Sequence, residues 1–224
     1  LKDPRHLRLL IEGLDRLDWF EARREGLGDL YEGLLAKNAG ELKSGAGQYF
    51  TPRPLIDCMV ACLQPRPGEV IQDPAAGTGG FLVAAHRWMC GQYAGFADLD
   101  ADARSFQRQG AIVAMELVED VGRLLRMNLL LHDLEGQVVI GDALSSAGAR
   151  LGPADVILTN PPFGSKKGGG GPSRADLEHP SANKQLGFLQ HVYRGLRPGG
   201  RAGVVVPDNV LFEEHTGRQV RAEL

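Results

Sequence analysis

The sequence has little that would place the protein in a membrane or outside the cell. No apolar run approaches the roughly 20 residues that a membrane-spanning helix needs. The N-terminal stretch LKDPRHLRLL lacks the apolar core of a secretory signal. Cysteine is scarce, and the three that occur, Cys58, Cys62 and Cys90, do not suggest a disulfide framework. Together these absences favour a cytoplasmic protein with no membrane partner, and we expect the cysteines to be thiols of the core.

The sequence also lacks an excess of basic charge. Its formal net charge is −3 at pH 7, so no overall positive field favours binding to nucleic acid. If the protein handles DNA, we expect a partner to supply much of the non-specific affinity. The chain begins at Leu1 and stops at VRAEL within a helical pattern, which suggests a fragment of a longer protein.

Two patterns of apolar residues divide the 224-residue chain. Helical spacing over residues 5–40 predicts a helical N-terminal segment, residues 1–44. After it, short β-rich runs alternate with longer helical runs, which predicts an α/β domain over residues 45–224, a mostly parallel sheet with helices on both faces. The predicted strands are 69–73, 111–116, 137–142, 155–160 and 201–207, and the predicted helices are 54–64, 79–90, 118–131 and 184–196.

Four of the predicted strands end in a polar residue: Asp73, Glu116, Asp142 and Asn160. A single Asp at such a place is ordinary, because Asp commonly caps the helix that follows. The carboxyl ends of parallel strands meet at one edge of the sheet, and ligands bind there. Four polar strand ends therefore predict a ligand site.

A glycine-rich stretch, DPAAGTGGF (73–81), follows the first predicted strand. Its small residues allow a tight turn into a helix whose first N–H groups can hold an anionic group. A dinucleotide-binding loop would need glycine at position 82, where Leu82 stands, and no Lys-Ser or Lys-Thr pair of a phosphate loop follows. The loop is therefore expected to bind something other than a pyrophosphate.

The stretch NPPFG (160–164) ends the fourth predicted strand. Two prolines fix φ and remove backbone donors, so they terminate the strand in a rigid turn. The next residues, SKKGGGGPS (165–173), contain four consecutive glycines and predict a mobile loop. Our hypothesis is that DNA orders this loop in the full complex. Lys166 and Lys167 in this loop either touch phosphates or are solvated.

These motifs together resemble a known family. DPAAGTGGF followed by NPPF is similar to the S-adenosylmethionine-dependent methyltransferases that modify adenine N6 in DNA. GQYFTPRPLIDCMV (47–60) and MELVEDVGRLLRMNLLLHD (115–133) resemble the modification subunit of type I restriction-modification systems, and the likeness covers about residues 45–210. NPPF alone is also found in enzymes that methylate rRNA guanine or a glutamine amide.

The resemblance implies a Rossmann-like methyltransferase fold in which residues 45–224 are a C-terminally truncated catalytic domain. It implies S-adenosylmethionine as cofactor, no metal, and methyl transfer to N6 of a flipped adenine. DNA, a specificity subunit and a second modification subunit are the implied partners, with a restriction subunit as a further candidate. The alternatives are an amino-methyltransferase for RNA or protein glutamine, and a catalytically silent scaffold.

The resemblance also suggests site residues. The expected cofactor-binding residues are Gln48, Tyr49, Phe50, Thr51, Pro52, Arg53, Asp73, Gly77, Thr78, Gly79, Gly80, Glu116 and Asp142, and the expected catalytic residues are Asn160, Pro161, Pro162 and Phe163.

Several of these roles have alternatives. Thr51 before Pro52 could instead cap a helix, whereas the resemblance puts Thr51 near the cofactor's carboxylate and Phe50 against the cofactor. Glu116 is the preferred acceptor for the ribose hydroxyls, with Asp98 and Asp100 as rivals, so residues 91–110 would be an insertion.

Asp142 and Asp73 also have alternatives. Asp142 is placed near the cofactor's adenine by the resemblance but could be a helix cap, and Asp73 could orient the glycine loop rather than touch the ligand.

The expected roles of the NPPF residues follow from the chemistry of methyl transfer to adenine. Asn160 Oδ1 and the Pro161 carbonyl are suited to accept from the two N–H groups of adenine N6. Phe163 would stack on the flipped base.

Overall fold

The computed structural model describes residues 4–16, 28, 31, 33, 51–164 and 174–224. Within these ranges the N-terminal segment contains helix α1 (Pro4–Asp15). The expectations for Gln48, Tyr49 and Phe50, and for the glycine-rich loop with Lys166 and Lys167, lie outside the described residues and stay predictions.

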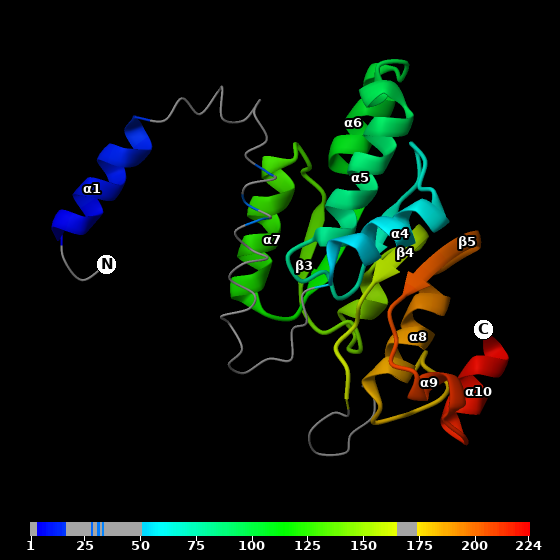
Figure 1. The fold of residues 1–224 in the computed structure, drawn as a ribbon. Coiled ribbons are helices and arrows are strands. Elements are labelled where there is room, and N and C mark those ends of the chain that lie inside the picture. The colour runs from blue at the N-terminus through cyan, green and yellow to red at the C-terminus, as the bar shows by residue number, and fades with distance from the viewer. Residues whose placement is uncertain (1–3, 17–27, 29–30, 32, 34–50, 165–173) are drawn as a thin grey trace.

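Five strands form one parallel sheet (Figure 1). They are β1 (Ile71–Asp73), β2 (Ile112–Glu116), β3 (Gln137–Ile140), β4 (Ala154–Thr159) and β5 (Leu196–Val204). Their order is β3-β2-β1-β4-β5, and each neighbouring pair is parallel. The chain moves outward from β1 first in one direction and then in the other, which creates a topological switch between β1 and β4.

The five predicted strands are confirmed. The start of β1, the end of β3 and the end of β5 shift by two or three residues, and the start of β5 shifts by more. β5 begins at Leu196, five residues before the predicted start, because Leu196 already pairs with Ala154. The register then shifts between Ala154 and Val156, so the RPGG turn is taken up as an irregularity of the strand.

The four predicted helices are confirmed with ends within two residues: α4 (Arg53–Leu63), α5 (Gly80–Gln92), α7 (Glu119–Leu131) and α8 (Lys184–Gly195). Two further helices, α6 (Ala101–Gln109) and α9 (Asn209–Phe212), were not predicted, nor were the 3₁₀ turns Ala94–Phe96 and Gly148–Arg150. The last helix, α10 (Thr216–Glu223), contains most of VRAEL, where the sequence showed a helical pattern. Among the residues of α6 only Gln107 is buried, so this helix carries no apolar period. The sequence feature that could have predicted α6 is its N-cap residue, because Asp100 Oδ1 accepts from the Ala103 N–H at 2.8 Å.

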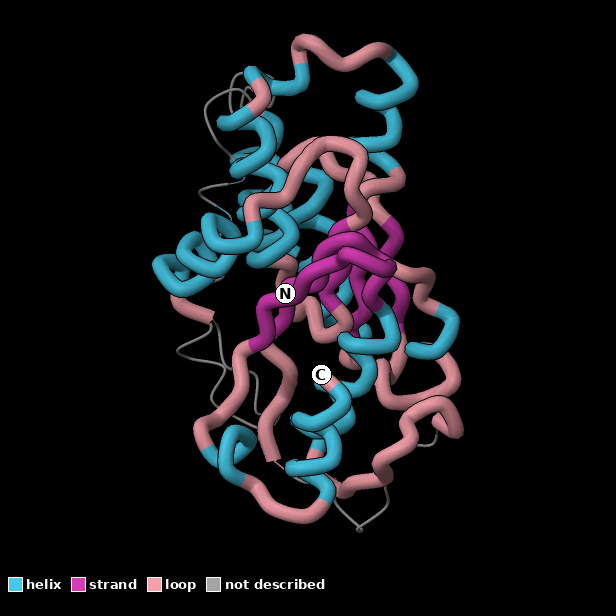
Figure 2. The backbone as a smooth tube through the Cα atoms, turned by 90° about the vertical axis from the view of Figure 1, so that its right-hand side faces the viewer, coloured by secondary structure: helices cyan, strands magenta, loops and turns pink. Residues whose placement is uncertain are grey.

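Helices cover both faces of the sheet, as predicted, and the strands lie at the centre of the molecule (Figure 2). On one face, Ile71, Val156 and Leu158 pack in a cluster with residues of α4, α5 and α7. On the other face, Ile157 packs with Val192 of α8. Alternate residues of β4 thus pack against the helices on opposite faces of the sheet, which is why this strand is an almost unbroken apolar run.

The expectation of core thiols was wrong for Cys58 and Cys62, whereas Cys90 packs against the main core cluster. Cys58 and Cys62 are exposed on α4, and Cys90 is half-buried. Ile56 and Val60 lie on the buried face of α4. Cys58 and Cys62 each follow one of them by two residues, and so they lie on the opposite face of the helix, toward solvent. Among the helices that the structure describes, none is both long and apolar enough to cross a bilayer.

Candidate active site

The four polar strand ends gather at one edge of the sheet, as the sequence predicted. Asp73 and Glu116 are the last residues of β1 and β2, Asn160 directly follows β4, and Asp142 lies two residues beyond β3. Because β3, β2, β1 and β4 are adjacent and parallel, these residues follow one another along the edge in the order Asp142, Glu116, Asp73, Asn160.

Glu116 connects the end of β2 to two neighbouring loops. Its buried carboxylate accepts from the Gly77 N–H through Oε2 and from the Val118 N–H through Oε1, each at 2.9 Å. The rivals Asp98 and Asp100 are both exposed, and Asp100 is engaged in capping α6. This geometry favours Glu116 as the acidic residue of the site.

The glycine loop after β1 depends on conformations that suit glycine. Gly77 and Gly79 have φ values of +55° and +88°. A Cβ on Gly79 would lie 2.6 Å from Leu125 Cδ1, whereas a Cβ on Gly77 would have nothing within 4 Å. The loop is therefore packed against α7 at Gly79 and open at Gly77. Leu82, where a dinucleotide loop would need glycine, is fully buried.

Asn128 of α7 holds the same loop, and the sequence analysis did not single it out. Its Nδ2 donates to the Thr78 carbonyl at 2.9 Å, and the side chain is 1% exposed. The sequence feature that could have pointed to Asn128 is an amide within the apolar run MNLLLH, since a polar group on a buried helix face needs a hydrogen-bond partner.

Asp73 is buried at the end of β1 with an altered acidity. It accepts from the Ala75 N–H at 3.0 Å, so it orients the start of the glycine loop, as one alternative expected. The pKa of Asp73 is raised to about 7, mainly by burial and in smaller part by the charge of Glu116, against the lowering effect of the Thr159 hydroxyl and the Ala75 N–H.

Asp142 closes a turn rather than capping a helix. Its Oδ1 accepts from the Leu144 N–H at 2.8 Å, and its backbone carbonyl accepts from Ser145 Oγ at 2.6 Å. The residues that follow form turns up to the 3₁₀ turn at Gly148–Arg150, so the helix-cap alternative was wrong.

The NPPFG turn is held at both ends. Asn160 Nδ2 donates to Thr51 Oγ1 at 3.0 Å, and the Gly164 carbonyl accepts from the N–H of Lys184, the first residue of α8, at 3.1 Å. Pro161 is buried between these anchors, whereas Phe163 is 37% exposed. The aromatic ring therefore lies at the surface, beside an amide whose position is fixed.

Thr51 does not cap α4, and that alternative was also wrong. The N-cap is Pro52, without a side-chain cap bond, and the helix begins at Arg53. The Thr51 hydroxyl is engaged with Asn160 instead. Thr51 therefore joins the segment before α4 to the carboxyl end of β4.

A cluster of side chains around the buried Arg174, close to Asp142, was not predicted. Arg174 is 8% exposed, donates to Asp176 Oδ1 at 2.9 Å and to the Ala143 carbonyl at 3.0 Å, and contacts His191. Burial, helped by the charge of Arg174, lowers the pKa of His191 to about 4, which keeps this imidazole neutral. The cluster fixes the chain after residue 173 to the turn that follows Asp142.

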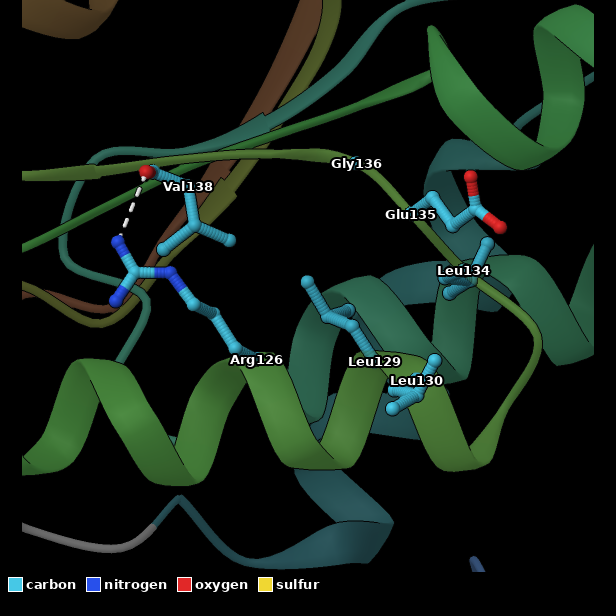
Figure 3. A pocket seen from close by; sticks show the side chains of 7 residues that line it. All are labelled: Arg126, Leu129, Leu130, Leu134, Glu135, Gly136 and Val138. Carbon is cyan, nitrogen blue, oxygen red and sulfur yellow. Dashed lines mark hydrogen bonds between the residues drawn. The ribbon is translucent and has the colours of Figure 1, made fainter.

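Two hollows differ in their distance from the row of polar strand ends, because one lies at the opposite end of the sheet and the other reaches Thr51, which binds Asn160. One of about 270 Å³ lies at the amino end of β3, where Arg126 of α7 donates to the Val138 carbonyl at 3.4 Å (Figure 3). The other, of about 500 Å³, lies between α4 and α5 and reaches Thr51 and Gly80. In the described part of the chain, no cluster of three or more His, Cys, Asp or Glu residues could hold a metal.

The strand order, the glycine loop after β1 and the acidic end of β2 define a Rossmann-like methyltransferase fold of the S-adenosylmethionine-dependent class. The family model described as N-6 DNA Methylase matches residues 22–224, and the chain belongs to this family.

Several similar proteins are methylase subunits of type I restriction enzymes. The type I restriction enzyme StySPI methylase subunit of Salmonella potsdam is 49% identical over 100% of this chain and 44% of its own length. The crystal structure of the type I restriction enzyme EcoKI M protein matches with a TM-score of 0.73 and 48% identity, over 80% of this chain and 38% of that one. A chain from a structure on complex assembly and conformational transition of the type I R-M system matches with a TM-score of 0.75 and 30% identity, over 88% of this chain and 40% of that one. The present chain thus spans less than half the length of these relatives.

Proposed function

We propose that this chain is the catalytic part of a type I modification subunit, which transfers a methyl group from S-adenosylmethionine to N6 of adenine in DNA. The observation that carries the proposal is the anchored NPPF turn at the switch between β1 and β4, with Asn160 held by Thr51 at 3.0 Å. Residues 45–224 are the proposed catalytic domain and residues 1–44 a helical N-terminal segment, into which the family match extends from residue 22.

The residues at the sheet edge fit S-adenosylmethionine. The Glu116 carboxylate has acceptor capacity beyond its two backbone donors, which suits two ribose hydroxyls. Space is open beside Gly77, where a side chain would otherwise stand. When bound, the cofactor supplies a methyl group carried on a sulfonium centre.

The remaining cofactor contacts are proposed from the resemblance. Asp142 would accept from the adenine amine of the cofactor, and Asp73 would orient the glycine loop, Gly77 to Gly80. The segment Gln48 to Arg53 would cover the cofactor. In this arrangement carboxylates face a cofactor that carries positive charge, which is favourable.

Asn160 and Pro161 are the proposed acceptors for the amino group of the target adenine. The lone pair of N6 is delocalised into the ring, so the nitrogen is a weak nucleophile. Two acceptors aimed at its N–H groups favour a pyramidal nitrogen whose lone pair faces the methyl donor. Pro161 and Pro162 keep the backbone of this turn rigid.

The target base must leave the duplex to reach this turn, and Phe163 is the proposed stacking surface. Base stacking on an aromatic side chain contributes about 1–3 kcal/mol. The relatives are methylase subunits of type I restriction enzymes, so we propose that this chain acts with a specificity subunit, a second modification subunit and a restriction subunit. Since its proposed substrate is DNA, we propose that it works in the cytoplasm.

The proposal is tested by radiolabelled methyl transfer from S-adenosylmethionine to adenine-containing duplex DNA by the full methyltransferase assembly. Asn160→Ala is expected to abolish labelling while calorimetric cofactor binding is largely kept. Asn209→Ala, which changes an exposed asparagine at the start of α9, is the matched control and should label like wild type.

Two outcomes would contradict this proposal and assign another function. Labelling of rRNA or of a protein glutamine, with unlabelled DNA, would assign an amino-methyltransferase with another substrate. Absence of cofactor binding by the wild-type assembly would assign a silent scaffold.

A further inference from the structure

Thr51 and Asn160 are 109 residues apart in the chain, and their side chains share a hydrogen bond of 3.0 Å. Both residues are half-buried. One stands just before α4 and the other just after β4, so the bond connects two elements that the sequence does not bring together.

The surroundings of Thr51 restrict its motion. Pro52 follows it, and a residue before proline is confined to extended backbone. Pro52 itself has φ −57°, and Pro54 lies in the first turn of α4. Because α4 takes no side-chain cap bond, the Thr51 hydroxyl is not engaged in capping the helix.

The chemistry of an amide gives this bond a consequence at Asn160. An asparagine side chain has a donor end and an acceptor end, and it can rotate to exchange them. In this structure the donor end is bound by Thr51. The acceptor end, Oδ1, is the atom that the proposed reaction uses.

We propose that Thr51 is a positioning residue for Asn160, holding the amide nitrogen so that the amide oxygen is kept for the amino group of the methyl acceptor. This inference rests on the proposed function, and it differs from the role that the resemblance implies for Thr51, a contact with the cofactor's carboxylate. The two roles affect different steps: positioning affects turnover, whereas a cofactor contact affects cofactor binding.

Thr51→Val and Thr51→Ser separate these roles. Valine keeps the shape of threonine without its hydroxyl, so it leaves Nδ2 of Asn160 without this acceptor, whereas serine retains the hydroxyl. Misplacement of a reacting group by about 1 Å can cost about 100-fold in rate. We therefore expect Thr51→Val to lower kcat about 10-fold or more in the full assembly, with the KM for DNA and the Kd for S-adenosylmethionine within about 3-fold of wild type. Thr51→Ser is expected to restore kcat to within about 3-fold.

Thr216→Val is the matched control, because Thr216 is a half-buried threonine at the start of α10, outside the site. It should leave kcat unchanged. The unfolding midpoint gives a second measurement: Thr51→Val is expected to lower it in the wild-type background and not in Asn160→Ala, where the partner is missing.

The inference is overturned if Thr51→Val keeps kcat near wild type at saturating DNA and cofactor, whatever its effect on cofactor affinity. Failure of Ser to restore kcat would also overturn it, because the hydroxyl would then not be the active feature. In both cases the wild-type assembly still methylates DNA. If the wild-type assembly itself does not, the proposed function fails instead.

Discussion

Glu116 binds the backbone N–H of Gly77 at 2.9 Å, which ties the carboxyl end of β2 to the glycine loop that follows β1. The other carboxylate oxygen binds the Val118 N–H at the start of α7. One buried carboxylate therefore sets the geometry of two loops at the proposed cofactor site, and the predictions below concern this carboxylate and the glycine loop that it holds.

Glu116→Gln should weaken cofactor binding and destabilise the fold. Glutamine replaces one acceptor oxygen by an NH₂ group, which would face a backbone N–H, donor against donor. Loss of a hydrogen bond to a charged group costs about 1.5–3 kcal/mol. We expect that loss in the free energy of urea unfolding and about 10-fold or more in S-adenosylmethionine affinity by calorimetry. Asp98→Asn, at an exposed position, is the control and should bind like wild type. Equal affinity of Glu116→Gln and wild type would exclude Glu116 as the ribose acceptor.

Asn128→Leu should loosen the glycine loop. Leucine has a similar volume but cannot donate to the Thr78 carbonyl, which would lose its bond of 2.9 Å. An unsatisfied carbonyl costs about 1–3 kcal/mol when it is buried, and Thr78 is half-buried, so we expect a loss toward the lower end of this range. The expected result is lower thermal stability together with weaker cofactor binding. Met127→Leu, at a position that is 51% exposed on the same helix, should change neither. If cofactor affinity is unchanged in Asn128→Leu, the bond to Thr78 serves stability alone.

Gly79→Ala should be more destabilising than Gly68→Ala, although both glycines have similar backbone conformations, with φ +88° and +92°. Alanine at either position pays about 1–2 kcal/mol for left-handed backbone. At Gly79 the new Cβ would also lie 2.6 Å from the fully buried Leu125, which adds about 1–3 kcal/mol for overpacking, while at Gly68 nothing lies within 4 Å. Unfolding of the two variants in urea measures the difference, and equal losses would show that α7 yields to the added methyl group.

Asp73→Asn should remove a pH dependence of stability. Burial raises the folded-state pKa of Asp73 from its ordinary value of 3.8 to about 7, so the folded protein holds a proton that the unfolded chain releases. The stabilisation from this group is therefore present below about pH 4 and lost as the pH rises toward 7, by on the order of 4 kcal/mol.

The measurement for Asp73 is urea unfolding of wild type and Asp73→Asn at pH 5 and pH 8. Wild type should lose stability relative to the variant between these values. His191, whose depressed pKa gives stability that is lost as the pH falls from 6.5 toward 4, is common to both proteins and cancels in the comparison. A constant difference between the two proteins would show that Asp73 is charged in the folded state throughout this range.

Local patterns in the sequence were sufficient to predict the strands and the longer helices. The five strands and the four longer helices of the α/β domain were predicted because apolar periodicity and turn residues report burial directly. The row of Asp73, Glu116, Asp142 and Asn160 followed from the parallel topology. α6 was missed because most of its residues are exposed and its one buried residue is Gln107, so apolar periodicity does not mark this helix.

The sequence by itself determined the fold class, the row of polar strand ends and the rigid NPPF turn, because each depends on spacing within one segment or on the shared direction of parallel strands. Only the tertiary structure decided that Thr51 holds Asn160 rather than capping α4, that Asn128 holds Thr78, and that Asp73 titrates near neutrality. These properties arise from packing between distant segments, since a hydrogen bond needs both partners in place and a pKa shift needs water to be excluded.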